Sequence, residues 1–170
     1  MKTAVNSFVD TLLPATPTLF SVTTFNTTAS VLLGFSGNAA AIKSSVNSIT
    51  MGQWTNWEQG LVTGNGTYDP RPAIPNIIIF ASDGQPNRYG VNGTQGTGMF
   101  DAAALAAAVT QANAIKSSGT RIITLGVGTD SSLFSNLTQI ASPSSSYTVS
   151  NYAALNASLH ALATDLCGGT

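Results

Sequence analysis

A chain of 170 residues and 17.4 kDa is long enough to bury the core of one domain. Charged residues make up 8% of it, and the 6 basic and 7 acidic side chains leave a net charge of -1. This balance excludes a basic surface for nucleic acid or an anionic membrane, and no run approaches the ~18 apolar residues of a membrane-spanning helix.

The first third of the chain predicts a helix, a hairpin and two further helices. Apolar residues recur at helical spacing over residues 5–13, and Pro14 ends that helix. Residues 19–26 and 30–35 are rich in β-branched and aromatic side chains and are separated by a short turn, which predicts an antiparallel hairpin. An apolar stripe predicts a helix over 39–49, and a short helix is expected near 55–62.

The rest of the chain alternates strands with helices. After the Gly- and Pro-rich stretch 64–75, the elements expected are a strand at 77–80, a helix at 100–118, a strand at 121–127, a helix at 131–141, a strand at 146–149 and a last helix from Tyr152. The later strands are continuously apolar, which is typical of strands buried on both faces of a parallel sheet. The sequence therefore predicts one doubly wound α/β domain over 1–170, with a mostly parallel sheet, one antiparallel edge strand and helices on both faces.

Asp83 follows the most apolar of these strands. In open α/β sheets, ligands bind where the carboxyl ends of the strands meet, so this carboxylate is placed to bind one. Aspartate is also common as a cap of a turn or helix. The stretch NIIIFASDGQPN alone leaves both interpretations open.

Four stretches, in order along nearly the whole chain, resemble the von Willebrand factor type A domain. They are LFSVTTFNTTASVLLGF (19–35), IIIFASDGQPN (77–87), RIITLGVGTD (121–130) and the C-terminal stretch 135–167. The resemblance implies a Rossmann-like fold with Mg²⁺, or Mn²⁺ or Ca²⁺, at a metal-ion-dependent adhesion site. It implies that Thr55 and Asp83 are ligands of this cation.

The sequence departs from the family in one respect. The Asp-x-Ser-x-Ser motif that provides most of the family's ligands is absent, and so is the central first strand that precedes it. Burying such a strand contributes on the order of 10 kcal/mol, comparable to the stability of a whole domain. We therefore expect a domain truncated at its N-terminus, whose first strand is supplied by an upstream segment or by another chain.

Sequons and the single cysteine bear on the cellular compartment. Together with the scarcity of charge, five Asn-x-Ser/Thr sequons favour a secreted glycoprotein; they lie at Asn26, Asn65, Asn92, Asn136 and Asn156. The N-terminus carries no signal peptide, so secretion would require a longer chain. Cys167 is expected either to form a disulfide with a cysteine outside this chain or to be a spare thiol.

No enzymatic activity is expected. The only histidine, His160, lies on the last helix, and no Gly-x-Ser-x-Gly elbow is present. The glycine-rich stretch 93–98 lacks the lysine of a phosphate-binding loop.

The expected function is therefore an extracellular adhesion or protein-binding domain. Its partner would be a protein ligand or a neighbouring subunit that donates or receives a β-strand. The alternative is a structural module of an extracellular filament or matrix that assembles without an active metal site. Trp54, Trp57 and Tyr89 are candidates for the ligand rim around the cation, although core packing is also common for tryptophan.

Overall fold

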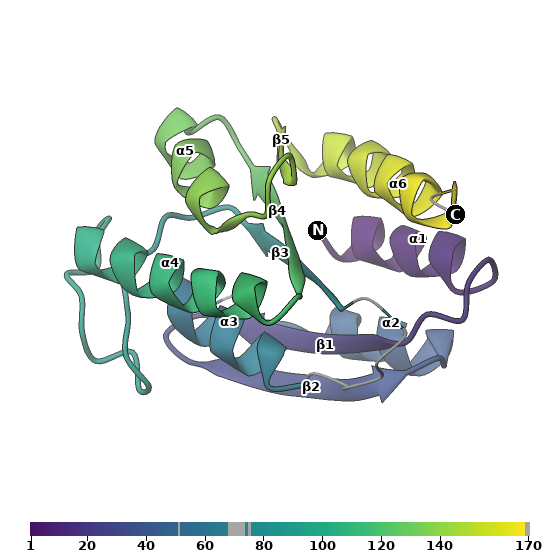
Figure 1. The fold of residues 1–170 in the computed structure, drawn as a ribbon, viewed down its shortest axis with the longest axis horizontal. Helices are drawn as coiled ribbons and strands as arrows, with labels where there is room; N and C mark the ends of the chain where they lie inside the picture. Colours follow the sequence, from purple (N-terminus) through teal and green to yellow (C-terminus); the bar gives the residue numbers. More distant parts are fainter. Residues whose placement is uncertain (51, 68–73, 75, 169–170) are drawn as a thin grey trace.

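The computed structural model describes residues 1–50, 52–67, 74 and 76–168, in which helices cover both faces of a layer of strands (Figure 1). The elements in chain order are α1 (Lys2–Leu12), β1 (Phe20–Phe25), β2 (Ala29–Ser36), α2 (Ala39–Ser48), α3 (Trp57–Asn65), β3 (Ile77–Ser82), α4 (Ala102–Ser117), β4 (Arg121–Val127), α5 (Ser131–Ile140), β5 (Ser146–Val149) and α6 (Tyr152–Gly168). No helix within this described part is long and apolar enough to cross a membrane.

The strands form two sheets. β3, β4 and β5 pair in parallel, with Ile78 opposite Ile122 and Leu125 opposite Tyr147, while β1 and β2 form an antiparallel pair. Parallel strands joined by helices, plus one antiparallel hairpin, confirm the predicted mixed α/β class.

The core lies in two layers on either side of β4. Every residue of β4 from Ile122 to Val127 is buried. Ile123, Leu125 and Val127 pack against α1 and α6, whereas Ile122 packs against α3, α4 and α5. This alternation follows from the two-residue period of a strand, and it explains the continuous apolar run at 121–127.

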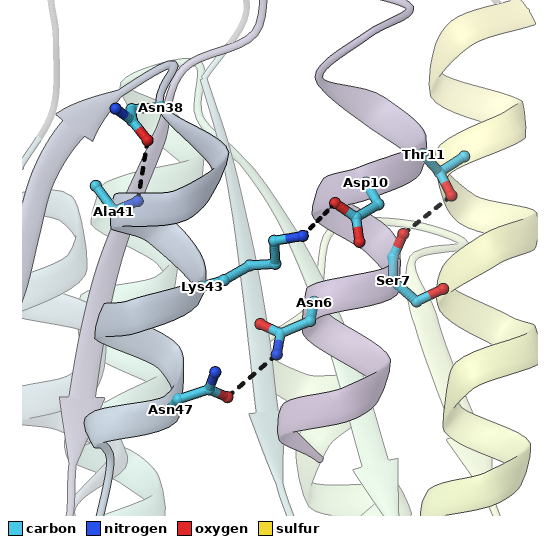
Figure 2. A network of polar contacts seen from close by, with 8 residues as sticks. All are labelled: Asn6, Ser7, Asp10, Thr11, Asn38, Ala41, Lys43 and Asn47. Carbon is cyan, nitrogen blue, oxygen red and sulfur yellow. Dashed lines mark hydrogen bonds and ion pairs between the residues drawn. The ribbon is translucent and has the colours of Figure 1, made fainter.

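The β1–β2 pair is anchored to α1 and α2 by a third cluster, formed by Val9, Val22, Ile42 and Val46. Polar contacts join the two helices at the surface (Figure 2). Lys43 Nζ lies 2.6 Å from Asp10 Oδ1, and Asn6 Nδ2 donates to Asn47 Oδ1 at 3.1 Å. Because exposed ion pairs contribute little, the apolar cluster provides most of the attachment.

A gap separates β1 from β3. Among the described residues, no backbone hydrogen bond joins the two strands, and no Cα of β1 lies within 8 Å of a Cα of β3. Their side chains nevertheless meet, because the Phe25 and Phe80 rings stack at 4.8 Å. Paired strands lie about 4.8 Å apart, so the separation of more than 8 Å between β1 and β3 is compatible with one strand between them.

The two strands that border this gap run in the same direction. The Asn26 carbonyl, just after β1, accepts from the Asn56 N–H at 2.8 Å, and the Asn87 N–H, beyond β3, donates to the Thr55 carbonyl at 3.0 Å. The carboxyl ends of β1 and β3 therefore meet at the same loop. No described strand pairs with both of them.

One helix boundary differs from the sequence-based expectation, and one predicted residue lies outside the described part of the chain. The fourth helix begins at Ala102 rather than Phe100, because the Asp101 side chain accepts hydrogen bonds from the N–H groups of Ala103 and Ala104 and caps the helix there. The side chain of Cys167 lies outside the described part of the chain, so its disulfide stays a prediction.

Candidate metal centre at the carboxyl edge of the sheet

Asp83 and Thr55 meet at the carboxyl edge of the sheet. Asp83 is exposed and follows the last residue of β3. A Cβ atom placed on Gly84 would lie 3.2 Å from the Thr55 hydroxyl oxygen, so that hydroxyl lies directly beside the residue after Asp83. The structure thus brings together the two residues predicted as ligands, while cation binding itself stays a prediction.

Asn87 holds the two loops against each other. Its Oδ1 accepts a hydrogen bond from the Thr55 N–H at 2.8 Å, and its own N–H donates to the Thr55 carbonyl. The Arg88 N–H donates to the same carbonyl at 3.3 Å. Thr55 is therefore fixed by its backbone, which leaves its side-chain hydroxyl available at the site.

Asn56 ties a third loop to this pair. It is fully buried, and its Nδ2 donates to the carbonyls of Thr27 and Gly90 at 3.0 and 3.1 Å. Its Oδ1 accepts from the Gln59 N–H and so caps α3. The sequence reasoning missed Asn56, although Asn-x-x-Gln ahead of an apolar run is the pattern of a capping box.

Trp57 is a core residue, and its prediction as a ligand-rim residue is wrong. Its side chain is 0% exposed and packs edge-on against Phe80, with ring centroids 5.8 Å apart. The indole N–H donates to the Ser82 hydroxyl at 3.2 Å, and that hydroxyl donates to the Gly84 carbonyl at 2.8 Å. Trp57 is the first residue of α3, and its side chain points into the core. Through Ser82 it stabilises the turn that carries Asp83.

Trp54 and Tyr89 are half-buried, and both belong to the loops at this edge. The Arg88 guanidinium lies 4.3 Å from the centroid of the Trp54 ring, within reach of a cation–π interaction. A Cβ on Gly98 would approach the Trp54 ring to 2.8 Å, so only glycine lets this loop lie against the indole.

Apolar side chains that the sequence reasoning did not single out are exposed on the loop between β3 and α4. Val91 and Met99 are each 77% exposed, and Phe100 is 48% exposed. No periodicity marks such residues in a glycine-rich loop, and only the structure shows them uncovered. We call the segment 84–101 the rim loop.

The described residues supply only part of a cation's coordination shell. They contain no group of three or more His, Cys, Asp or Glu side chains close enough to hold a metal ion. Mg²⁺ takes about six oxygen ligands, of which Asp83 and Thr55 offer two. Helix α1 starts at the same edge, because Met1 lies near the Asp83 carboxylate.

A second polar cluster lies between the rim loop and α5. The Gln85 Nε2 donates to Asp130 Oδ2 at 2.8 Å, and the Gln85 Oε1 accepts from Asn136 Nδ2 at 2.8 Å. Hydrogen bonds, above all the one from Gln85, hold the pKa of Asp130 below its usual value. Asp130 also caps α5 by accepting a hydrogen bond from the Ser132 N–H.

The asparagine side chains of the five sequons differ in their exposure to solvent. Asn136 is 8% exposed and its Nδ2 donates a hydrogen bond to Gln85 Oε1, so the fold disfavours glycosylation at this position. Asn92 and Asn156 are exposed, while Asn26 and Asn65 are half-buried. Glycosylation at these four positions stays a prediction.

Comparison with known proteins agrees with this architecture. The family model of the von Willebrand factor type A domain matches residues 1–162. A search of curated proteins finds no match.

Solved structures extend the comparison. The vWF domain of the type V pili tip protein Mfa5 from Porphyromonas gingivalis superposes with a TM-score of 0.85 at 15% identity, covering 99% of this chain and 87% of that one. Proximal thread matrix protein 1 from the mussel byssus, with a zinc-occupied MIDAS motif, superposes with a TM-score of 0.77 at 25% identity and covers 98% of this chain. The pilus adhesin SpaC from Lactobacillus rhamnosus GG superposes with a TM-score of 0.76 at 18% identity and covers 99% of this chain.

This chain spans only 40% of the byssus protein and 28% of SpaC. None of these three proteins is named as an enzyme, and all are named as parts of pili or of a thread matrix.

Proposed function

The chain belongs to the von Willebrand factor type A domain family, and we propose that it is an extracellular adhesion domain that binds a protein partner through a divalent cation. The observation that carries this proposal is the position of the Thr55 hydroxyl beside the Asp83–Gly84 turn, at the edge where the strands β1 and β3 end.

The side-chain oxygens of Asp83 and Thr55 are of the chemical type that binds a hard cation. A carboxylate and a hydroxyl are the oxygen ligands that Mg²⁺ prefers, and Mn²⁺ or Ca²⁺ accepts the same donors. Asp83 and Thr55 would hold one side of the ion, and the remaining positions would be taken by water and by an Asp-x-Ser-x-Ser loop from outside these residues. When bound, the cation offers a position at which a partner's carboxylate replaces a water molecule.

The proposal includes a β-strand from outside the 170 residues, which fills the gap between β1 and β3. The Asn76 carbonyl accepts from the Arg121 N–H at 3.0 Å and so points to β4. Because backbone groups alternate between the two edges of a strand, those of Ile77, Ile79 and Ala81 point into the gap. An added parallel strand would pair with them.

Burial supports the added strand as well. All of β4 beyond Arg121 is buried, whereas Ile78, Ile79 and Ala81 of β3 are only partly buried although helices cover both faces of the layer. A parallel strand in the gap would end beside Thr55 and Asp83. It would thereby deliver the loop that follows it to the cation.

The structural relatives support an extracellular role. Two of them are pilus proteins, one of which is named an adhesin, and one is a thread matrix protein with zinc at its MIDAS motif. Exposed sequons at Asn92 and Asn156 and the low charge fit the same setting.

The matrix protein also supports a second candidate function. A structural module of an extracellular filament or matrix would use the same fold and the same strand without an active metal site. Its support is the likeness to a byssus matrix protein at 25% identity, together with a surface that carries few charges.

Calorimetric titration with Mg²⁺ and Mn²⁺ distinguishes the two. The protein would carry a strand fused ahead of Met1, so that the sheet is complete. Adhesion through a cation predicts saturable binding that is lost in Asp83→Ala and kept in the matched control Asp10→Ala. Asp10 lies on α1, and its carboxylate pairs with Lys43 of α2. Absence of binding in the complete protein would leave the structural module.

A further inference from the structure

A cavity of about 460 Å³ lies where the rim loop meets the first turns of α5. It is lined by Gln85, Phe100, Ser131, Ser132, Ser135 and Asn136. Its volume falls within the range of small-molecule sites, which is about 300–1,000 Å³. None of its lining residues is a candidate ligand of the cation.

A chain of amides fixes the floor of this cavity. Gln139 donates to Asn136, Asn136 donates to Gln85, and Gln85 donates to the Asp130 carboxylate, at 3.3, 2.8 and 2.8 Å. Asn136 is 8% exposed, so its position is set by the fold. Each primary amide carries two N–H groups, and the bonds described above use one on Gln85 and one on Asn136. Each therefore keeps one donor for a ligand.

The walls add hydroxyl groups and one aromatic face. Ser131, Ser132 and Ser135 are exposed on the first turns of α5, and each hydroxyl both donates and accepts. Phe100 is 48% exposed, which is unusual for a large apolar side chain, and its ring borders the same space. Donors and acceptors beside one apolar face match the chemistry of a pyranose ring.

Charge narrows the class of ligand. The lining contains no Lys or Arg, and the one ionised group in contact with it is the Asp130 carboxylate that Gln85 holds. An anionic ligand would be repelled by this carboxylate. The amide, hydroxyl and aromatic groups of the lining match a neutral, polyhydroxylated ligand.

We propose that this cavity binds a neutral sugar residue, whose hydroxyl groups bond to Gln85, Asn136 and the serines of α5 while its apolar face packs on Phe100. The site is separate from the Thr55–Asp83 centre and needs no cation. In an adhesion domain it would add recognition of glycans to the binding of a protein partner.

NMR titration of the ¹⁵N-labelled protein, with its first strand restored, tests the proposal; the ligands are methyl α-mannoside, methyl β-galactoside and N-acetylglucosamine at millimolar concentrations. At least one sugar is expected to shift the amide signals of residues 84–86, 99–101 and 130–136 in a saturable way. Phe100→Ala is expected to weaken that binding about five- to tenfold, and Gln85→Ala by a similar factor.

Matched controls separate this site from its surroundings. Met99→Ala changes a neighbouring exposed side chain outside the lining and is expected to leave the affinity unchanged. Binding is expected to persist with a chelator present and in Asp83→Ala, so a failure of the proposed cation site would not affect it. N-acetylneuraminic acid, which is anionic, is expected to cause no shifts.

The absence of saturable shifts with all three sugars would overturn the proposal. So would an affinity that Phe100→Ala and Gln85→Ala leave intact, or binding that requires a divalent cation. Phe100 is partly exposed on a loop, so its variant is expected to keep the wild-type spectrum elsewhere, and the dispersion of that spectrum shows that the variant is folded.

Discussion

The indole N–H of Trp57 donates a hydrogen bond to the hydroxyl of Ser82 at 3.2 Å in the buried core. This bond joins the start of α3 to the last residue of β3, and Ser82 in turn donates to the carbonyl of Gly84. The turn that carries Asp83 is therefore held in place by a side chain from another element.

Trp57→Phe is expected to destabilise the protein by about 2 kcal/mol, because it removes the donor to Ser82 and leaves a space beside Phe80. Urea unfolding followed by circular dichroism measures the change. Trp54→Phe is the matched control, and it is expected to cost under about 1 kcal/mol because that ring is half-buried and makes a cation–π contact at the surface. Equal costs for the two variants would contradict the buried role of Trp57.

Asn56→Ala is expected to cost about 3 kcal/mol. The change removes the cap of α3 and leaves the partly buried carbonyls of Thr27 and Gly90 without this donor. Thermal and urea unfolding both measure this loss of stability. Asn92→Ala, on the exposed part of the rim loop, is expected to stay within about 0.5 kcal/mol of the wild type. A neutral Asn56→Ala would show that the three loops are held together by other contacts.

Hydrogen exchange in the 170-residue chain is expected to alternate along β3. The amides of Ile77, Ile79 and Ala81 point into the gap, so they should exchange more than about tenfold faster than those of Ile78 and Phe80, which face β4. Exchange monitored by NMR resolves these neighbours one by one.

A strand fused ahead of Met1 is expected to abolish this alternation, whereas a fused segment of the same length with alternating lysines should leave it. Uniform protection of β3 without any added segment would mean that the gap does not exist in solution.

The pKa of Asp130 is expected to rise in Gln85→Ala, since the hydrogen bond from Gln85 is the largest cause of its lowered value. A carboxyl whose pKa is lower in the folded state stabilises that state above the unfolded pKa. This contribution is lost as the pH falls through the folded pKa. The variant should therefore begin acid unfolding at a higher pH than the wild type.

NMR titration of the Asp130 carboxyl carbon gives the value directly. Gln139→Ala is the control, because Gln139 donates to Asn136 and not to Asp130. An unchanged pKa of Asp130 in Gln85→Ala would contradict the assigned cause.

Much of the fold could be predicted because local pattern and packing agree along this chain. The strand at 121–127 was predicted at its observed bounds, since its continuously apolar run fits a strand buried on both faces. The short strand at 146–149 was also predicted at its observed bounds, although only Val149 in it is buried. The meeting of Thr55 and Asp83 came from a family resemblance and not from spacing in the sequence.

The contacts that build the edge of the sheet could not be predicted. Asn56 bonds to Thr27 and Gly90, residues 29 and 34 positions away, and no periodicity reports such a contact. The same holds for Trp57, whose inward direction depends on where α3 begins. Hydrogen bonds between loops depend on the tertiary structure, which a local sequence pattern does not predict.

The central claim, that Asp83 and Thr55 form part of a cation site, is tested most directly with paramagnetic Mn²⁺. In the ¹⁵N spectrum of the protein with its first strand restored, substoichiometric Mn²⁺ should broaden the amide signals of Thr55, Asp83 and Gly84 first. The effect should disappear in Asp83→Ala and be reversed by excess Mg²⁺. Broadening centred on Asp10 or Asp130, or spread evenly over the exposed carboxylates, would contradict the claim.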